Sequence, residues 1–227
     1  MKLENQTVSM SFADLVRATK NDKRSAPHFP YTLEVCRCRY CAYCHHGKCA
    51  LKHCCCLEER VMARTCTIGE VIHQTFSVLN DKLLNYRLKE AIIQINARKG
   101  CFLDTEHRKR FAEGCALTRR AEPKFIAQIF LLSANAKLWK KAIKVLGKKG
   151  FEYYDLDITG VSDAEYFYYS AANVYEYSST RLDLYDLYND EIVSDEEFQM
   201  LCISTVICVY GINVLRLTDS KRGERKE

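Results

Sequence analysis

The chain has 227 residues, 13 cysteines and a formal net charge of +5. No apolar run reaches the roughly 18 residues of a membrane-spanning helix, and the first ten residues lack the apolar core of a secretion signal. We therefore expect a cytoplasmic protein whose cysteines are thiols rather than disulfides, because a reducing compartment keeps them unpaired.

The net charge hides a strong asymmetry between two parts of the chain. Residues 1–150 carry 28 Lys and Arg against 13 Asp and Glu, an excess of +15. Residues 151–227 carry 6 Lys and Arg against 16 Asp and Glu, a net charge of −10. Such a split predicts either two surfaces that bind different partners or one half that neutralises the other.

The first 66 residues are predicted to form a short helix, a linker and a cysteine-rich module. Ser11 is a suitable N-cap for a helix over residues 12–19. The polar stretch that follows ends in Pro-His-Phe-Pro, so residues 1–30 are interpreted as an N-terminal helix and linker. Nine of the 13 cysteines lie in residues 31–66, which are interpreted as a metal module.

The cysteine spacing is typical of a metal site, and zinc is the best candidate because it takes four thiolate or imidazole ligands. Either Cys38 with Cys41 or Cys41 with Cys44 can supply one half of a site, and Cys49 with one or two cysteines of the run 54–56 can supply the other. A single site is best served by Cys38, Cys41, Cys49 and Cys55. The number of zinc ions, one or two, remains open, because there are more candidate ligands than one ion can bind. The candidates are Cys36, Cys38, Cys41, Cys44, Cys49, Cys54 and Cys55, with His45, His46 and His53 as weaker candidates.

Two other chemistries compete with a structural zinc site. The run from Cys38 through Cys44 resembles the start of a bacterial ferredoxin cluster motif, but the next cysteine follows at the wrong spacing and no proline comes after it. An iron–sulfur cluster is therefore the runner-up cofactor. A catalytic zinc needs a nearby carboxylate, and Glu58 and Glu59 follow the block without any known catalytic spacing. We therefore expect a binding protein rather than an enzyme.

A basic helical region is predicted over residues 67–122. Thr67 and Glu70 have the spacing of a capping box, and Asp104 is expected to cap a helix over residues 105–117. Two helices that meet near Asn80 are predicted between these signals. Their inward residues follow helical intervals: Ile68, Val71, Ile72, Thr75, Phe76 and Leu79 in the first, and Leu83, Leu84, Leu88, Ala91, Ile92 and Ile95 in the second.

A C-terminal helical domain is predicted over residues 123–218, before a charged tail at 219–227. Pro123 suits a helix start, and Ser194 with Glu197 makes a second capping box, for a helix ending at Tyr210. Residues 151–159 are the one segment expected to be extended. The predicted helices cover residues 124–132, 137–146, 164–177, 181–189 and 195–210, with Cys101, Cys115, Cys202 and Cys208 in the core. The predicted fold is therefore mainly α, a small zinc-binding module followed by a helical bundle.

Basic and aromatic residues predict contact with nucleic acid or with a nucleoprotein. Single-strand binding modules combine such residues around small zinc knuckles. The acidic half, with nine tyrosines in residues 151–200, is instead typical of a protein interface and can imitate the charge of nucleic acid. The candidate nucleic-acid or partner contacts are Arg37, Arg39, Arg108, Lys109, Arg110, Arg119, Arg120, Lys137, Lys141, Lys144 and Lys148.

Three runs carry a resemblance to a known group of proteins: KFIAQIFLLSANAKLWKKAIKVL, DLDITGVSDAEYFYYSAANVY and LYDLYNDEIVSDEEFQMLCISTVICVYGINVL. Together they resemble a C-terminal region of accessory proteins of clostridial mobile genetic elements, namely conjugative transposons and phages. The block CRYCAYC…CCCLEER is similar to a cysteine module from the same setting. The resemblance implies small non-enzymatic proteins that manage DNA transfer or block host defences such as CRISPR nucleases and restriction enzymes.

Three hypotheses follow. The first is a non-enzymatic, zinc-stabilised protein that acts on nucleic acid or a nucleoprotein, in its most concrete form an inhibitor of a host defence nuclease of the anti-CRISPR type. The second is a DNA-binding accessory or regulatory protein of conjugation, and the third is an iron–sulfur or zinc enzyme. No small-molecule substrate and no membrane partner are indicated.

Overall fold

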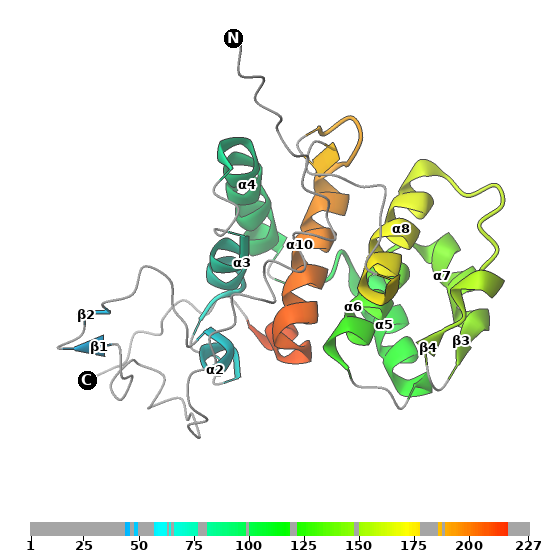
Figure 1. Ribbon diagram of the computed structural model, residues 1–227, viewed down its shortest axis with the longest axis horizontal. Helices are drawn as coiled ribbons and strands as arrows, with labels where there is room; N and C mark the ends of the chain where they lie inside the picture. Colours follow the sequence, from blue (N-terminus) through cyan, green and yellow to red (C-terminus); the bar gives the residue numbers. More distant parts are fainter. Residues whose placement is uncertain are drawn as a thin grey trace, which may run out of the picture.

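The computed structural model describes residues 44–45, 48–49, 57–62, 64, 66–76, 81–98, 100–118, 122–147, 150–177, 186–187 and 189–217. This part of the chain is mainly helical, as the sequence predicts (Figure 1). The predicted helix at 12–19, the linker, most of the segment 181–189 and the charged tail lie outside the described residues. The α-helices are α2 (Leu57–Met62), α3 (Ile68–Phe76), α4 (Lys82–Arg98), α5 (Thr105–Leu117), α6 (Pro123–Ala134), α7 (Ala136–Ala142), α8 (Asp163–Tyr177) and α10 (Asp195–Tyr210).

Short elements connect these helices. The 3-10 helices are η2 (Ile143–Val145), η3 (Tyr153–Asp155) and η4 (Ile212–Arg216). Strands β1 (Cys44–His45) and β2 (Lys48–Cys49) form one antiparallel pair, and β3 (Leu146–Gly147) and β4 (Gly150–Phe151) form another. None of the described helices is both long enough and apolar enough to cross a membrane.

Two buried helices, α6 and α10, form the centre of the described structure. All residues of α6 from Phe125 to Ala134 and all residues of α10 from Glu197 to Val209 are buried. A helix that is apolar on every side needs neighbours all round. Accordingly α10 packs against α3 and α4 on one side and α6 on the other, and α6 also packs against α5 and α8 (Figure 1). The inner layer is therefore flanked by α3 and α4 on one side and by α5, α7 and α8 on the other.

Local capping signals fix where several helices begin. Thr67 Oγ1 accepts a hydrogen bond from the Glu70 N–H at 3.1 Å, and the Glu70 carboxylate accepts one from the Thr67 N–H at 3.2 Å. Ser194 and Glu197 make the same reciprocal pair at the start of α10. Asp104 accepts from the His107 N–H at 2.6 Å. The three of these predicted caps that lie within the described residues are therefore confirmed, whereas Ser11 lies outside them. Each confirmed cap satisfies backbone donors that the first helical turn leaves unpaired.

The structure corrects three details of the predicted elements. Leu83, expected to face inward, is 66% exposed, because the buried stripe of α4 follows Leu84, Leu88 and Ile95. The helix expected to reach residue 146 ends at Ala142 and passes through η2 into β3. The segment expected to be extended contributes only its first residue to β4, which pairs with β3, and continues as η3. Gly150 has a φ of 146°, which glycine adopts without the strain of a side chain, so the chain can reverse here.

The four cysteines assigned to the core behave largely as expected. Cys101, Cys202 and Cys208 are buried, and Cys115 on α5 is half-buried. Burial raises the pKa of the Cys115 thiol to about 11 and that of the Cys202 thiol still further, so both stay protonated at neutral pH. These cysteines therefore act as small core residues.

Candidate nucleic-acid interface

Only a small part of the cysteine block falls within the described residues. Cys44 lies opposite Cys49, and His45 opposite Lys48, in the antiparallel pair of β1 and β2. The other candidate ligands, together with Arg37 and Arg39, lie outside the described residues. Within the part of the chain that the structure describes, no group of three or more His, Cys, Asp or Glu is arranged to hold a metal. The zinc site therefore stays a prediction.

The basic run at the start of α5 divides into residues with different environments. Arg108 and Lys109 are exposed, and Lys109 Nζ lies 2.6 Å from Glu106 Oε1. Arg110 is half-buried, and its guanidinium donates to the carbonyls of Ser133 at 2.7 Å and Ala134 at 3.1 Å. Arg110 thus caps the C-terminal end of α6, where unpaired carbonyls favour a cation. Arg108 and Lys109 are the members of the run that face solvent.

His107, which precedes these residues, is fully buried. Its Nδ1 accepts from the Leu103 N–H at 3.2 Å, and its Nε2 lies 3.0 Å from the Phe130 carbonyl oxygen. This pair of partners requires a neutral ring that is protonated on Nε2. Burial lowers the pKa of His107 from 6.5 to about 4, although the Phe130 carbonyl opposes the shift. His107 is therefore a neutral core residue that joins α5 to α6.

The lysines of α7 lie opposite its buried side. Leu138, Trp139 and Ala142 are buried, while Lys137 and Lys140 are exposed on the opposite face. Lys144 in η2 is also exposed. Lys141 is half-buried, and its Nζ donates to the Thr159 carbonyl at 3.2 Å. Lys140 adds to the predicted contacts, because its spacing of three residues from Lys137 places both on one helix face.

The packing brings the starts of α5 and α7 to the same end of α6. Arg110 holds the start of α5 against the last residues of α6, and Asn135, which directly follows α6, caps α7. Farther along, Trp139 Nε1 donates to Glu113 Oε2 at 3.0 Å, which ties α7 to α5. We define the basic face as Arg108, Lys109, Lys137 and Lys140. Three of its members make no ion pair within the described residues, namely Arg108, Lys137 and Lys140.

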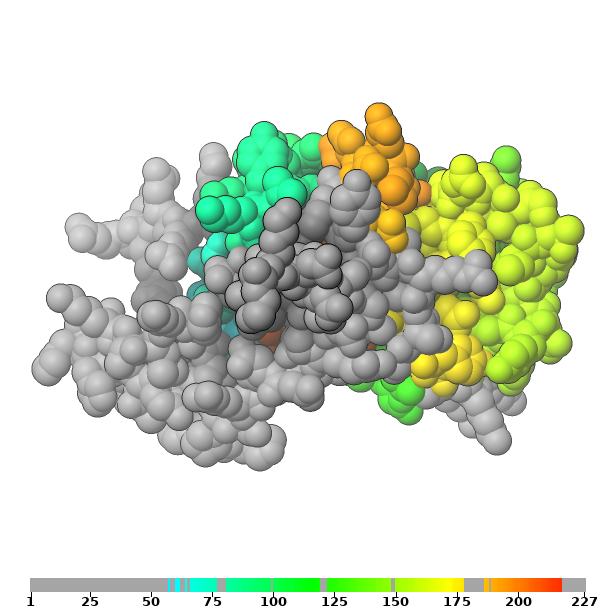
Figure 2. Space-filling model, turned by 45° about the horizontal axis from the view of Figure 1, so that its top comes forward, coloured from blue at the N-terminus to red at the C-terminus, as the bar shows by residue number. Residues whose placement is uncertain are grey.

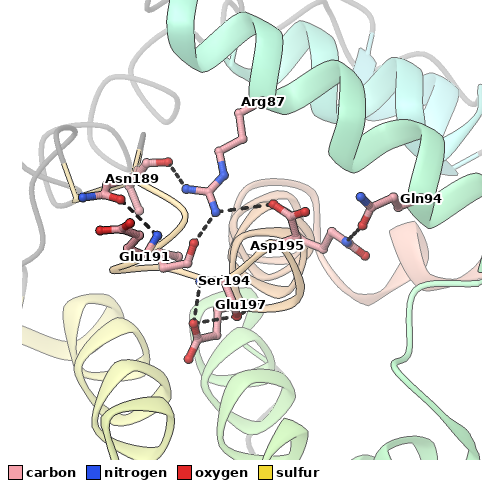
Figure 3. Close-up of polar contacts among 10 residues, drawn as sticks. Arg87, Gln94, Asn189, Glu191, Ser194, Asp195 and Glu197 are labelled. Atoms are coloured by element: carbon pink, nitrogen blue, oxygen red, sulfur yellow. Dashed lines mark hydrogen bonds and ion pairs between the residues drawn. The ribbon is translucent and has the colours of Figure 1, made fainter.

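A second group of polar residues, around Arg87 of α4, holds the fold together (Figure 3). Arg87 is only 8% exposed and donates to the carbonyls of Leu187, at 2.5 Å, and Val193. It also lies 3.6 Å from the Asp195 carboxylate and stacks over Phe198, 4.6 Å from the ring centre. The guanidinium points into the segment before α10 and is enclosed by these groups. Arg87 therefore fastens that segment and the first turn of α10 to α4, and it is not available to a ligand.

The remaining predicted contacts are not all described. Arg119, Arg120 and Lys148 lie outside the described residues. Of the predicted contacts that are described, Arg108, Lys109, Lys137 and Lys144 face solvent, while Arg110 and Lys141 donate to backbone carbonyls. The structure thus brings two of the predicted basic runs together and directs part of each into the protein.

Comparison with known proteins adds no further information. No family model matches the chain, and no curated protein or solved structure shows significant similarity to it.

Proposed function

We propose that this chain is a non-enzymatic binding protein that contacts the phosphate backbone of a nucleic acid or nucleoprotein through its basic face. The observation that carries the proposal is that α5 and α7, which both carry exposed cations, start at the same end of α6, and that in the described residues only Lys109 of these cations has an acidic partner, Glu106. Lysine and arginine on adjacent helix ends can contact successive phosphates, and such contacts are independent of base sequence.

The proposal predicts a specific dependence on salt. Each phosphate that a cation neutralises releases bound counterions, which contributes a slope of about −0.9 to the plot of log K against log salt for duplex DNA. Replacing Arg108, Lys137 and Lys140 with glutamine should therefore reduce the magnitude of this slope by up to about 3. All three side chains are exposed, so the fold should tolerate the changes.

Fluorescence anisotropy with a labelled 20-base-pair duplex and the matching single strand, across a series of salt concentrations, would measure the slope. The control is Lys82→Gln with Lys89→Gln, because both lysines are exposed on α4, on the far side of α10 from α7 (Figure 1). We expect the control to bind like the wild type. Equal loss in both variants, or a salt slope that the triple variant leaves unchanged, would contradict the proposal.

We further propose that the cysteine block binds one or two zinc ions that stabilise the N-terminal part. The cysteine spacing supports this, and so does the pairing of Cys44 with Cys49, because directly opposed residues in an antiparallel pair have Cα atoms about 4.5–5.5 Å apart. Two cysteines at that separation can share one ion. A closed thiolate site contributes to folding rather than to catalysis.

Elemental analysis of freshly purified protein tests the metal proposal. We expect zinc to be retained by the wild type and by Cys115→Ser, a control cysteine on α5, and to fall in the double variant Cys44→Ser with Cys49→Ser. Iron together with an absorbance band near about 400 nm would favour the iron–sulfur alternative. Protein without any bound metal would refute both.

An inhibitor of a host defence nuclease is the most specific form of the proposal. The resemblance to mobile-element accessory proteins and the division of charge along the chain support it. Affinity purification from a bacterial lysate should recover a nuclease complex that survives treatment with an added nuclease. Duplex binding by the purified protein, with no nuclease recovered, would instead favour the accessory protein of conjugation. Recovery of neither nucleic acid nor a nuclease complex would count against both.

A further inference from the structure

A group of tyrosines and acids covers the side of α8 that faces η3. Residues 151–177 contain Glu152, Asp155, Asp157, Asp163, Glu165 and Glu176 but no Lys, Arg or His. Tyr154 is 91% exposed, Tyr177 46% and Tyr166 41%. We call Tyr153, Tyr154, Tyr169, Tyr177, Glu152 and Glu176 the tyrosine face. In Figure 2 the yellow-green and yellow atoms of residues 150–177 gather at one end of the molecule, away from the green atoms of α4.

The rings of the tyrosine face form a continuous series. The ring centre of Tyr153 is 6.0 Å from that of Tyr169 and 6.0 Å from that of Tyr177, and both pairs meet edge to face. Tyr154 in turn lies 6.1 Å from Tyr177. These contacts place the exposed rings of Tyr154 and Tyr177 side by side at the surface, and the face of each ring is negatively polarised.

Two buried polar atoms, one in the tyrosine face and one on the adjacent Asn173, have no hydrogen-bond partner in the described structure. Tyr153 is 4% exposed and its hydroxyl is unpaired. Asn173 Oδ1 is also unpaired, whereas its Nδ2 lies 3.5 Å from the Tyr169 hydroxyl. Burial raises the pKa of Tyr153, and the nearby Glu176, Tyr169 and Tyr177 raise it further. Buried polar atoms without partners are rare in folded proteins, and a ligand at this face could supply the missing hydrogen bonds.

The ligand that fits this chemistry is a cation with several N–H donors. The carboxylates of Glu152 and Glu176 attract positive charge, and the C-terminal end of α8 at Tyr177 adds the negative end of a helix dipole. Asn173 Oδ1 can only accept a hydrogen bond. Within the protein, Lys124 Nζ lies 3.9 Å from Glu176 and Gln128 Nε2 donates to the same carboxylate at 3.1 Å, so Glu176 is partly occupied. Glu152 has no ion-pair partner in the described part of the chain.

We propose that the tyrosine face binds an arginine-rich segment of a partner protein. A guanidinium is planar, stacks on tyrosine rings and presents a rigid fork of donors, whereas an ammonium is more strongly hydrated and lacks the planar surface. Nucleic acid is excluded as the occupant, because its phosphates would meet the carboxylates of a segment that has no cation of its own. The proposal is independent of the basic face, which lies on other helices.

Binding of a nona-arginine peptide and a nona-lysine peptide to the full chain tests the proposal. Isothermal titration at about 0.15 M salt, where exposed charges are already partly screened, should show tighter binding of nona-arginine than of nona-lysine. Tyr154→Leu should weaken nona-arginine binding about tenfold, because it removes the most exposed ring, while Tyr154→Phe should retain most of the affinity. Glu152→Gln should weaken both peptides.

Tyr86→Leu is the matched control, because Tyr86 is 68% exposed on α4 and belongs to a different surface. We expect it to bind nona-arginine like the wild type. Equal affinity for the two peptides, or equal effects of the Tyr86 and Tyr154 variants, would overturn the proposal. Sedimentation of the wild type and Tyr154→Leu supplies a further check: a dimer that only the wild type forms would assign the face to a second copy of this chain and would also overturn it.

Discussion

Acidification provides a direct test of the contact between α5 and α6. His107 is 0% exposed, and its ring lies 4.8 Å from that of Phe130 and 5.1 Å from that of Phe102. Both ring nitrogens already have backbone partners that suit the neutral form. A proton added to Nδ1 would break the hydrogen bond from the Leu103 N–H and bury a charge next to Arg110. Burial accordingly lowers the pKa of His107 to about 4.

The sign and size of the effect on stability follow from this difference in pKa. The unfolded chain takes up the proton near pH 6.5, whereas the folded protein takes it up only near pH 4. Between these values the unfolded state binds more protons, so the free energy of unfolding falls as the pH falls. At about 1.4 kcal/mol per pH unit, the loss is about 2 kcal/mol by pH 5 and approaches about 3 kcal/mol below pH 4.

Urea unfolding between pH 7.5 and 4.5 would measure this loss, with the fluorescence of Trp139 as the probe, since it is the single tryptophan and is only 3% exposed. His107→Gln keeps a neutral side chain that can donate and accept, so it should flatten the pH dependence even if its stability at pH 7.5 is lower. His73→Gln is the control, because His73 is exposed on α3. Parallel pH profiles for the wild type and His107→Gln would refute the reasoning.

Two substitutions test how the helices are joined. Gly114→Ala should destabilise the protein by about 2 kcal/mol, although alanine has the better helix propensity. The added Cβ would lie 2.6 Å from the Trp139 ring and 2.7 Å from Ile129 Cγ2. A variant that is more stable than the wild type in thermal unfolding would contradict this packing. Arg87→Leu should cost about 3 kcal/mol, because it leaves two buried carbonyls unpaired. The control is Lys89→Leu, an exposed change on the same helix, which should alter the free energy of unfolding in urea by less than about 0.5 kcal/mol. Equal losses of stability in the two variants would refute the role of Arg87.

Helix starts were the most predictable part of the fold. Thr67, Asp104 and Ser194 each satisfy donors within three residues, so the signal and the structure that it specifies are local. The buried stripe of α3 was predictable for a similar reason, because its residues recur at helical intervals. Apolar residues on every side of α10 leave that helix only a central position.

Polar residues directed into the core were not predicted, because their partners lie far away in the sequence. Arg87 falls within the inward stripe of α4, but the carbonyls that accept from it are about 100 residues later. His107 has no other histidine near it in the sequence, but its spacing from Phe111 and Gly114 places all three on the buried face of α5. That spacing was a usable signal. The partners of Arg110 at the end of α6 were not, since they depend on how α5 and α6 pack.

The charge asymmetry of the sequence overstates the basic surface more than the acidic one. Arg87 and Arg110 donate to backbone carbonyls, and Arg98 donates to Gln199 at 2.5 Å, so part of the positive charge of residues 1–150 serves internal packing. By contrast, residues 151–177 contain no cation at all, and in the described structure Lys124 is the cation that pairs with one of their acids. The acidic segment is therefore the less compensated of the two.

The basic face and the tyrosine face lie toward opposite ends of α6, so the two proposed ligands should bind independently. Lys124 and Gln128 near the start of α6 contact Glu176, whereas Arg110 contacts its last two residues. Twelve helical residues span about 18 Å, which exceeds the screening length of about 8 Å at physiological salt. Saturating nona-arginine should therefore change the affinity for duplex DNA, measured by anisotropy after correction for peptide bound directly to DNA, by less than about twofold. A larger corrected change would mean that the two faces are coupled through the packing of α6.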